Sequence, residues 1–389
     1  MKKMLKYSMK PVVKFSVLAA SICFYSCKSE KKSDYSTAKN KSEKLIKFND
    51  VAIDSIQLDS INTSYVGEIY IKDNSLYFLD SRFCFLHEFQ KDGSIVHSYI
   101  GQGSGKNELP VKNVTFFSFL PNGGSFFMGT GYDCYIFNEK FERINDYAVN
   151  WRPTHTYEEL LDKPDPSLPE MYSLVYGGKV RAHGDDLIFP IVSQHQAYNP
   201  TMKTYAAEAR IFASMSLKNG YIKDIYGGFP PFFSKNFDFM VFGFPIFDID
   251  QKNNYKVSFG ADSLIYEIDD NMNVKKSFGF QGRNMKTEFK NTSDMELFNS
   301  NYHEQSKLNG HYTFLEFFEN KDLLFRGYSK GIGEASDGLQ IYKDNALIAD
   351  IDVPRGFRMS GIIDNEVYSN AFIDQSKNTI KIYKFKLTN

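Results

Sequence analysis

The chain has 389 residues, with 36 Phe, 25 Tyr and a single Trp, and its formal net charge is −1. Its length fits one large domain as well as two, and no Lys/Arg-rich block follows the N-terminal region, which excludes a basic surface for nucleic acid. Because Phe and Tyr favour strands, the composition favours an all-β protein.

The first 26 residues have the pattern of a secretory signal peptide. Four lysines occur among the first ten residues, and the mostly apolar stretch 12–24 is too short to span a bilayer. The sequence Phe-Tyr-Ser-Cys follows at residues 24–27. A small residue directly before a cysteine resembles the lipobox of bacterial lipoproteins, in which that cysteine is acylated and becomes the new N-terminus.

This resemblance implies lipidation at Cys27 and an outer membrane lipoprotein, on the periplasmic side or at the cell surface. Membrane attachment would then depend on the lipid anchor only. A simple cleaved signal peptide or an unusual membrane anchor is the alternative. Residues 27–44 are rich in Lys, Ser, Glu and Asn and have no apolar period, so they predict a flexible tether before a single domain at 45–389.

Pairs of short aromatic strands recur six times along this domain. Turn sequences such as Asp73-Asn74 and Asp344-Asn345 separate neighbouring strands. A repeat of a few dozen residues made of short strands is typical of a β-propeller. We therefore predict an all-β, six-bladed β-propeller. Its expected blades span residues 65–110, 111–150, 171–228, 240–283, 311–356 and 357–389.

The segment 51–58 alternates apolar and polar residues but has no hairpin partner nearby. The sixth repeat is short of one strand. We therefore expect the N-terminal strand to complete the last blade and close the ring, which protects the sheet edges.

Four stretches exceed what a blade needs and predict insertions. The last of them contains Ser293 and Glu296 in the spacing of a capping box, which predicts a short helix near 294–307. The four insertions are residues 150–170, 194–204, 227–245 and 284–309.

The most specific motif spans residues 89–93 and 100–109. It resembles a segment of NHL-like (NHL/TolB-like) six-bladed propellers, especially uncharacterised Bacteroidetes lipoproteins, and residues 276–283 repeat it faintly. The resemblance implies a propeller in the cell envelope. Its three glycines lack the strand-to-helix context of a phosphate loop, so they predict a crossover between blades: Gly101, Gly103 and Gly105.

Cys84 and Cys134 occupy the same position in two successive repeats. Equivalent positions on neighbouring blades are too far apart for a disulfide, even in a compartment that permits one. We expect two buried thiols.

Several acidic residues lie near predicted strand ends: Asp80, Asp133, Asp185, Asp262 and Glu366. They resemble in type the channel ligands of calcium-dependent propeller lactonases, and calcium (Ca2+) takes about 6–8 oxygen ligands. The alternative is that each acid binds the backbone of its own turn. No catalytic residue, cofactor or zinc site is predicted.

The insertions supply the candidate binding residues. Trp151 and His155 lie in the first insertion, and the third insertion is rich in Phe. If exposed, its rings would form a platform for a sugar or a partner protein; otherwise they pack against the blades. Its candidates are Phe229, Phe232, Phe233 and Phe237.

We therefore expect a lipid-anchored binding or scaffold module for a protein or glycan partner in the cell envelope. A propeller hydrolase or lyase with acidic residues at the central channel is the alternative.

Overall fold

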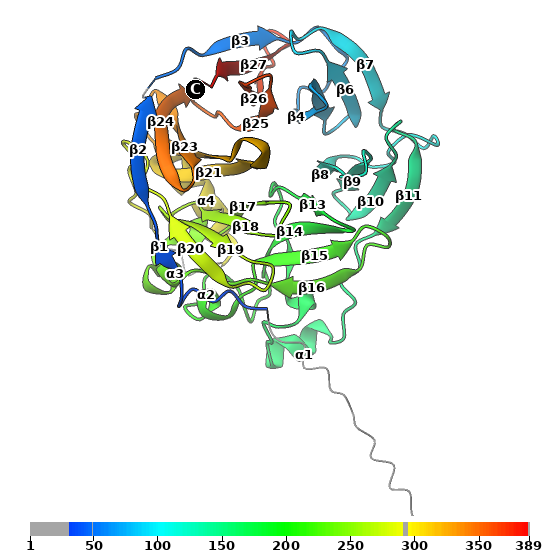
Figure 1. Ribbon diagram of the computed structural model, residues 1–389. Coiled ribbons are helices and arrows are strands. Elements are labelled where there is room, and N and C mark those ends of the chain that lie inside the picture. Colours follow the sequence, from blue (N-terminus) through cyan, green and yellow to red (C-terminus); the bar gives the residue numbers. More distant parts are fainter. Residues whose placement is uncertain (1–30, 49, 291–294, 388–389) are drawn as a thin grey trace, which may run out of the picture. The chain divides into compact units, whose positions relative to one another are not determined.

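The computed structural model describes residues 31–48, 50–290 and 295–387 (Figure 1). Six sheets, each of four or five strands and mostly antiparallel, surround a central channel as the blades of a β-propeller. The prediction of an all-β, six-bladed propeller is confirmed, and the blades follow one another along the chain as expected. Cys27 and the predicted signal peptide at 1–26 lie outside the described residues.

Blades one to three contain the strands β4 (Gly67–Lys72), β5 (Ser75–Asp80), β6 (Phe85–Phe89), β7 (Ile95–Ile100), β8 (Val114–Phe119), β9 (Ser125–Gly129), β10 (Asp133–Phe137), β11 (Arg143–Ala148), β12 (Ser173–Leu174), β13 (Arg181–His183), β14 (Asp186–Val192), β15 (Phe212–Ser216) and β16 (Ile222–Tyr226). Blades four to six contain β17 (Pro245–Ile249), β18 (Tyr255–Phe259), β19 (Ile265–Ile268), β20 (Val274–Phe278), β21 (Asn309–Phe318), β22 (Leu323–Gly331), β23 (Ser336–Lys343), β24 (Ala346–Pro354), β25 (Met359–Ile363), β26 (Glu366–Asp374) and β27 (Thr379–Lys386).

The helices lie mainly in the predicted insertions. Helix α4 (Met295–Leu308) agrees with the helix expected near 294–307, although Ser293 of the expected capping box lies outside the described residues. In the described part of the chain, no helix is long and apolar enough to cross a membrane. The other helical segments are α1 (Tyr157–Asp162), α2 (Tyr205–Glu208), α3 (Pro231–Lys235), η1 (Pro169–Met171), η2 (Phe237–Phe242) and η3 (Glu319–Lys321).

Asp-Asn pairs make the tight turns of several blades. Asp73 and Asn74 connect β4 to β5, and both have a positive φ, of 50° and 64°. Asp344 and Asn345 do the same between β23 and β24. Two consecutive positive φ angles define the hairpin turn whose twist matches that of the strands, and Asp and Asn tolerate that backbone.

Strand β3 (Asp54–Gln57) closes the ring. It pairs antiparallel with β27 of the last blade, with Gln57 opposite Lys381 and Asp54 opposite Lys384. This confirms the prediction that the N-terminal strand completes the sixth blade.

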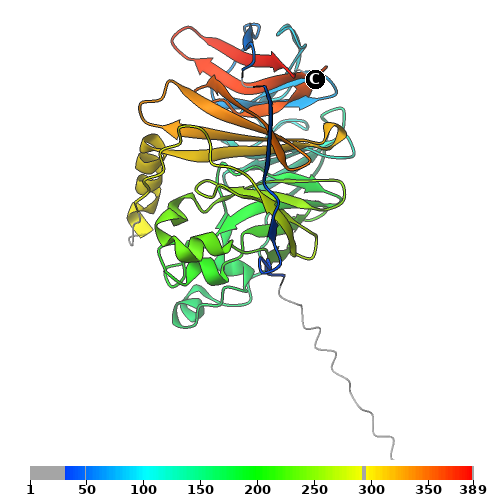
Figure 2. The same ribbon diagram turned by 60° about the vertical axis from the view of Figure 1, so that its left-hand side comes forward.

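The described residues before β3 also differ from the expected tether. Strands β1 (Lys39–Asn40) and β2 (Glu43–Phe48) pair in parallel with the outer strands β20 and β24 of blades four and five. Figure 2 shows this blue segment running across the outer edges of the sheets. We call residues 31–48 and 50–57 the N-terminal belt.

Backbone hydrogen bonds hold the belt in place. The Asp34 amide donates to the Met272 carbonyl at 3.1 Å, and the Lys41 amide donates to the Ser277 carbonyl at 2.8 Å. The side chains of β1 and most of those of β2 are exposed. Because strand pairing of this kind uses the backbone, it needs no apolar pattern, and the polar composition of residues 27–44 gave no sign of it.

The interior of the blades is rich in Phe and Tyr. Cys84 and Cys134 are free thiols with no exposed surface, as predicted. Burial, with a smaller effect of nearby acids, raises the pKa of each thiol to about 12.

Candidate ligand-binding site

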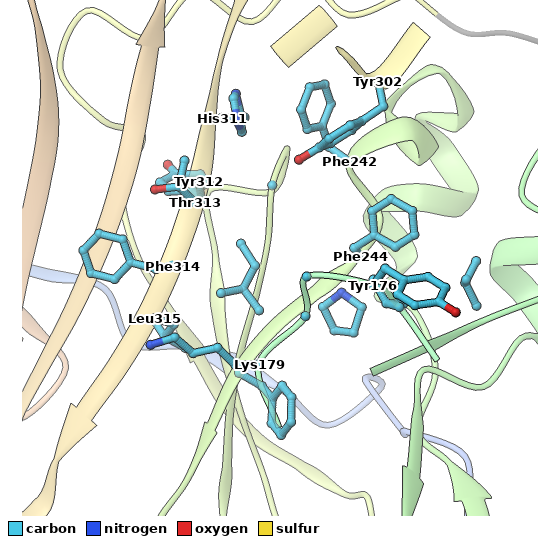
Figure 3. Close-up of a pocket in the computed structure, with 18 of the residues that line it drawn as sticks. Tyr176, Lys179, Phe242, Phe244, Tyr302, His311, Tyr312, Thr313, Phe314 and Leu315 are labelled. Carbon is cyan, nitrogen blue, oxygen red and sulfur yellow. The ribbon is translucent and has the colours of Figure 1, made fainter. Parts of the chain in front are cut away.

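A cavity of about 420 Å³ lies where blades three, four and five meet the insertions that contain η2 and α4 (Figure 3). Residues 311–315 of β21 form one wall, and residues 175–179 form another. A second space, of about 590 Å³, lies in the central channel among the inner strands. Four residues line both spaces, so the cavity is one mouth of the channel: Gly177, Gly178, Lys179 and Arg358.

Aromatic side chains from the insertions form much of the cavity wall. The ring of Phe242 lies 5.4 Å from the ring of Tyr302 and 4.8 Å from the imidazole of His311, measured between centroids. Phe244 lies 6.1 Å from Tyr302. Phe298 and Tyr302 are four residues apart in α4 and therefore share one face of the helix, which lines the cavity. Such a wall suits the apolar face of a ligand.

Gly260 allows Phe242 to reach the cavity. Its amide donates to the Phe242 carbonyl at 3.1 Å. A Cβ at this glycine would lie 3.0 Å from the Cβ of Phe242, which is closer than ordinary packing. Phe242 also packs against Phe289, with ring centroids 4.5 Å apart.

A charged network lies between the cavity and the channel. Arg181 Nη2 is 3.0 Å from Glu316 Oε2, and Arg181 Nε is 3.1 Å from Asp248 Oδ1. Lys179 donates to the other oxygen of Glu316. Asp248 also accepts from the Phe317 amide at 2.8 Å. Two cations face two carboxylates, so the network is electrically balanced.

Burial affects the two carboxylates of this network differently. Burial alone would raise the pKa of Glu316, but the charges of Arg181 and Lys179 outweigh it and hold that pKa below its ordinary value. Burial raises the pKa of Asp248 above its ordinary value, because Arg181 offsets only part of the desolvation. Glu316 is therefore the firmly ionised partner.

His311 presents a hydrogen-bond acceptor. Its Nδ1 lies 3.1 Å from the Asn309 carbonyl, and because a carbonyl can only accept, Nδ1 carries the proton. Burial is the main cause that lowers the pKa of His311, and the charge of Arg358 also lowers it. The neutral ring leaves Nε2 as an acceptor.

Arg358 is the cation of the cavity that the structure leaves without a carboxylate. Its backbone is fixed by two bonds with Asn370: the Arg358 amide donates to Asn370 Oδ1 at 2.8 Å, and the Asn370 amide donates to the Arg358 carbonyl at 2.7 Å. Phe357 and Met359 on either side are buried. Within the described ranges the guanidinium forms no ion pair, whereas Lys179 is paired with Glu316.

The lining therefore offers groups for recognition. Among the described residues, it contains no Asp, Glu, Ser or Cys, so the lining has no carboxylate that could act as a nucleophile or a general base. It combines aromatic faces, two cationic side chains and several polar groups, among them His311, His303, Gln194 and Thr313.

The predicted binding residues lie elsewhere. Trp151 lines an open hollow at the outer edges of blades two and three, together with Tyr221. His155 is exposed, and its Nδ1 lies 3.3 Å from Glu170 Oε1. The structure brings neither residue to the cavity.

The predicted Phe residues of the third insertion pack inward. Phe233 has no exposed surface, and the ring of Phe229 lies 5.5 Å from it. Phe232 is half-buried against the same cluster, 5.1 Å from Phe233. The side chain of Phe237 lies outside the described part of the structure. These contacts agree with the packing alternative rather than with an exposed platform.

The acidic residues considered for calcium are dispersed. Asp80 is fully buried and accepts hydrogen bonds from Thr63, Ser64 and the amides of the following turn. Asp262 accepts from Tyr266 at 2.7 Å, and Glu366 pairs with Lys384 at 3.1 Å. Asp133 and Asp185 are exposed. In the residues that the structure describes, no group of three or more His, Cys, Asp and Glu side chains could hold a metal ion.

The residues that do line the cavity gave little signal in the sequence. Lys179, His311 and Arg358 lie in unremarkable strand and loop sequences, and only the fold brings them together. Phe242 and Phe244 belong to the Phe-rich stretch at 227–245, so that stretch was a partial signal.

No protein-family model matches the chain, and neither does any curated protein. Solved structures do. A member of the DUF4221 family from Bacteroides vulgatus aligns with 88% of this chain and 99% of its own, at 14% identity and a TM-score of 0.64. A protein described as exported, from Bacteroides fragilis, aligns with 90% of this chain and 100% of its own, at 13% identity and a TM-score of 0.53.

Virginiamycin B lyase from Staphylococcus aureus aligns with 87% of this chain and 100% of its own, at 12% identity and a TM-score of 0.44. Likenesses at such identities concern the fold alone, and the last one carries no argument about chemistry.

Proposed function

We propose that this protein is a lipid-anchored binding module of the cell envelope, and that it takes one unit of a glycan into the cavity at the channel mouth. The observation that carries the proposal is the cavity itself. About 420 Å³ enclosed by aromatic walls fits a small ligand rather than the surface of a folded protein. Aromatic rings stack on the apolar faces of sugar rings and leave the hydroxyls to polar groups such as His311.

The envelope location rests on the N-terminal sequence. The basic and apolar stretches and the Ser-Cys at residues 26–27 support export and lipidation. That a protein of similar fold from Bacteroides fragilis is described as exported agrees with this location.

Binding is tested with protein that lacks residues 1–30 and a panel of defined oligosaccharides, by isothermal titration calorimetry. We expect one or more saccharides to bind, and Phe242→Ala and Tyr302→Ala each to weaken binding about 3–30-fold, the loss of one stacking contact and its buried area. Trp151→Ala and Tyr221→Ala are matched controls, because these aromatic residues line a different hollow.

The control variants also test the alternative site. If Trp151→Ala weakened binding and Phe242→Ala did not, the outer hollow would be the binding site and the cavity would not. If no saccharide bound at millimolar concentration, the proposed function would be refuted.

The anchor is tested separately in cells. We expect Cys27→Ser to abolish incorporation of labelled fatty acid and to move the protein from the membrane fraction to the soluble fraction. Unchanged membrane attachment in this variant would contradict lipidation at Cys27.

A further inference from the structure

We infer that the cavity selects an acidic sugar, whose carboxylate binds Arg358 and whose hydroxyl donates to His311 Nε2. This inference rests on the proposed function and deepens it, because it names the chemical class of the ligand. Three properties of the cavity support it: the charge of the cavity, its acceptor and its aromatic wall.

The cavity carries an unbalanced positive charge. In the described part of the chain, no Asp or Glu lines it, whereas Lys179 and Arg358 do. Lys179 is already paired with Glu316, and Glu316 in turn pairs with Arg181. The charge that remains for a ligand is the guanidinium of Arg358. A planar guanidinium is suited to bind a carboxylate through two parallel hydrogen bonds.

The balanced network explains why Arg358 stays available. Arg181 pairs with Asp248 and Glu316, and Lys179 pairs with Glu316. Arg181 lies on the inner strand β13, and Lys179 lies in the loop before that strand. The fixed backbone of Arg358 holds the residue beside the cavity before any ligand arrives, through its two hydrogen bonds with Asn370. Pre-ordering of this kind lowers the entropic cost of binding.

The acceptor favours a ligand that carries hydroxyls. With its proton on Nδ1, His311 can only accept at Nε2, so it cannot donate to a carboxylate there. A ligand that satisfies both residues must carry an anion for Arg358 and a hydrogen-bond donor for His311, and in a sugar that donor is a hydroxyl. The imidazole also packs against Phe242 in a tilted arrangement, with centroids 4.8 Å apart and the rings at 34°.

The aromatic wall of the cavity favours a ligand that contains a saccharide ring. The ring of Tyr302 lies 5.4 Å from Phe242 and 6.1 Å from Phe244, measured between centroids, and a wall of such rings suits the C–H face of a saccharide ring. A carboxylate, a hydroxyl and an apolar ring face together describe a uronic acid unit.

The test compares oligomers of galacturonic, glucuronic and mannuronic acid with their methyl esters, which keep the ring and lose the charge. We expect at least one acidic oligomer to bind 10-fold or more tightly than its ester at 20 mM NaCl, since a charged hydrogen bond contributes this much. The difference should shrink at 500 mM NaCl, because salt screens the exposed guanidinium.

Two variants separate the roles of the two residues. Arg358→Gln should weaken the acidic oligomer 10-fold or more and leave its ester unchanged. His311→Phe keeps a ring beside Phe242 but removes the acceptor, and it should weaken the acid and the ester equally. Arg355→Gln is the matched control, because Arg355 is exposed nearby and donates to the Glu334 carbonyl rather than into the cavity.

The outcomes distinguish this inference from the proposed function. Equal binding of acid and ester, or binding of neutral saccharides only, would overturn the acidic specificity and leave the proposed function intact. Equal loss in Arg358→Gln and Arg355→Gln would overturn the role of Arg358. Binding of no saccharide at all would overturn both.

Discussion

Arg181 Nη2 of blade three lies 3.0 Å from Glu316 Oε2 of blade five, while Arg181 Nε lies 3.1 Å from Asp248 of blade four. One side chain therefore connects three neighbouring blades at the channel. The three groups are largely buried, with 19%, 9% and 14% of their side-chain surfaces exposed, so each charge depends on the others for compensation.

We predict that Arg181→Met lowers the free energy of unfolding by about 3–5 kcal/mol, because it leaves the buried Asp248 without its cation and Glu316 with Lys179 alone. Urea denaturation at pH 7 measures this loss. Lys223→Met is the control: Lys223 pairs with Asp186 at the surface, and its removal should cost about 1 kcal/mol or less. Adding Asp248→Leu and Glu316→Leu to Arg181→Met should recover much of the loss. A loss under 1 kcal/mol in Arg181→Met would contradict the prediction.

The second prediction concerns the pH dependence of stability at Asp80. Burial disfavours its charge, but hydrogen bonds from Thr63, Phe83 and Ser64 outweigh burial and hold its pKa below the ordinary value. A carboxyl with a lowered folded pKa stabilises the protein above its unfolded pKa, about 3.9, and loses this effect as the pH falls through the folded pKa.

Asp80→Asn should therefore cost about 1.5–3 kcal/mol at pH 7, the contribution of hydrogen bonds to a charged group. The difference from the unmodified protein should shrink as the pH falls from 5 towards 2. Urea denaturation of both proteins at pH 7, 5 and 3 measures the difference in the free energy of unfolding. The other carboxyls titrate in both proteins, so their effect cancels in this difference. A difference that is constant with pH would show that the charge of Asp80 is not responsible.

The third prediction concerns the two thiols. Protein that lacks residues 1–30 contains only Cys84 and Cys134. Their pKa values of about 12 and their lack of exposed surface leave almost no accessible thiolate at pH 8. We expect no reaction with Ellman's reagent within an hour, and two thiols per chain after addition of denaturant. Fast reaction of either cysteine in the folded protein would contradict their burial.

The fourth prediction concerns the N-terminal belt. Protein that lacks residues 1–48 should keep its six blades but expose the outer strands β20 and β24, whose unpaired backbone groups favour association. We expect a lower Tm and larger species in light scattering than for protein that lacks residues 1–30. Lys41→Pro removes only the donor to the Ser277 carbonyl and should give an intermediate effect. Identical Tm and size for the two shortened proteins would refute a stabilising role of the belt.

The sequence predicted the blades because their signals are local. Aromatic strands, Asp-Asn turns and the alternating segment at 51–58 each carry their pattern within a few residues, and the order of the blades follows the order of the chain. Helix α4 was predicted for the same reason, from a capping pattern ahead of apolar residues.

The belt and the cavity could not be predicted in this way. The belt pairs through its backbone, so Lys39, Asn40 and their neighbours leave no periodic signal. The cavity depends on side chains from several segments that are far apart in the sequence, such as those of Lys179, His311 and Arg358. The composition of the Phe-rich insertion also does not show which of its rings face the core. Phe233 is in the core, whereas Phe242 reaches the cavity. Tertiary packing decides the position of each ring.

The belt also has a consequence for folding. Strand β3 is synthesised long before its partner β27, because all the other strands of the blades lie between them in the sequence. The outer strands that bind β1 and β2 are also made long after the belt itself. The N-terminal segment therefore remains unpaired until blades four, five and six have formed. Contacts between residues so distant in sequence slow folding and leave intermediates with open edges. Docking of the belt is thus expected to be the final step, which converts a row of folded blades into a closed ring.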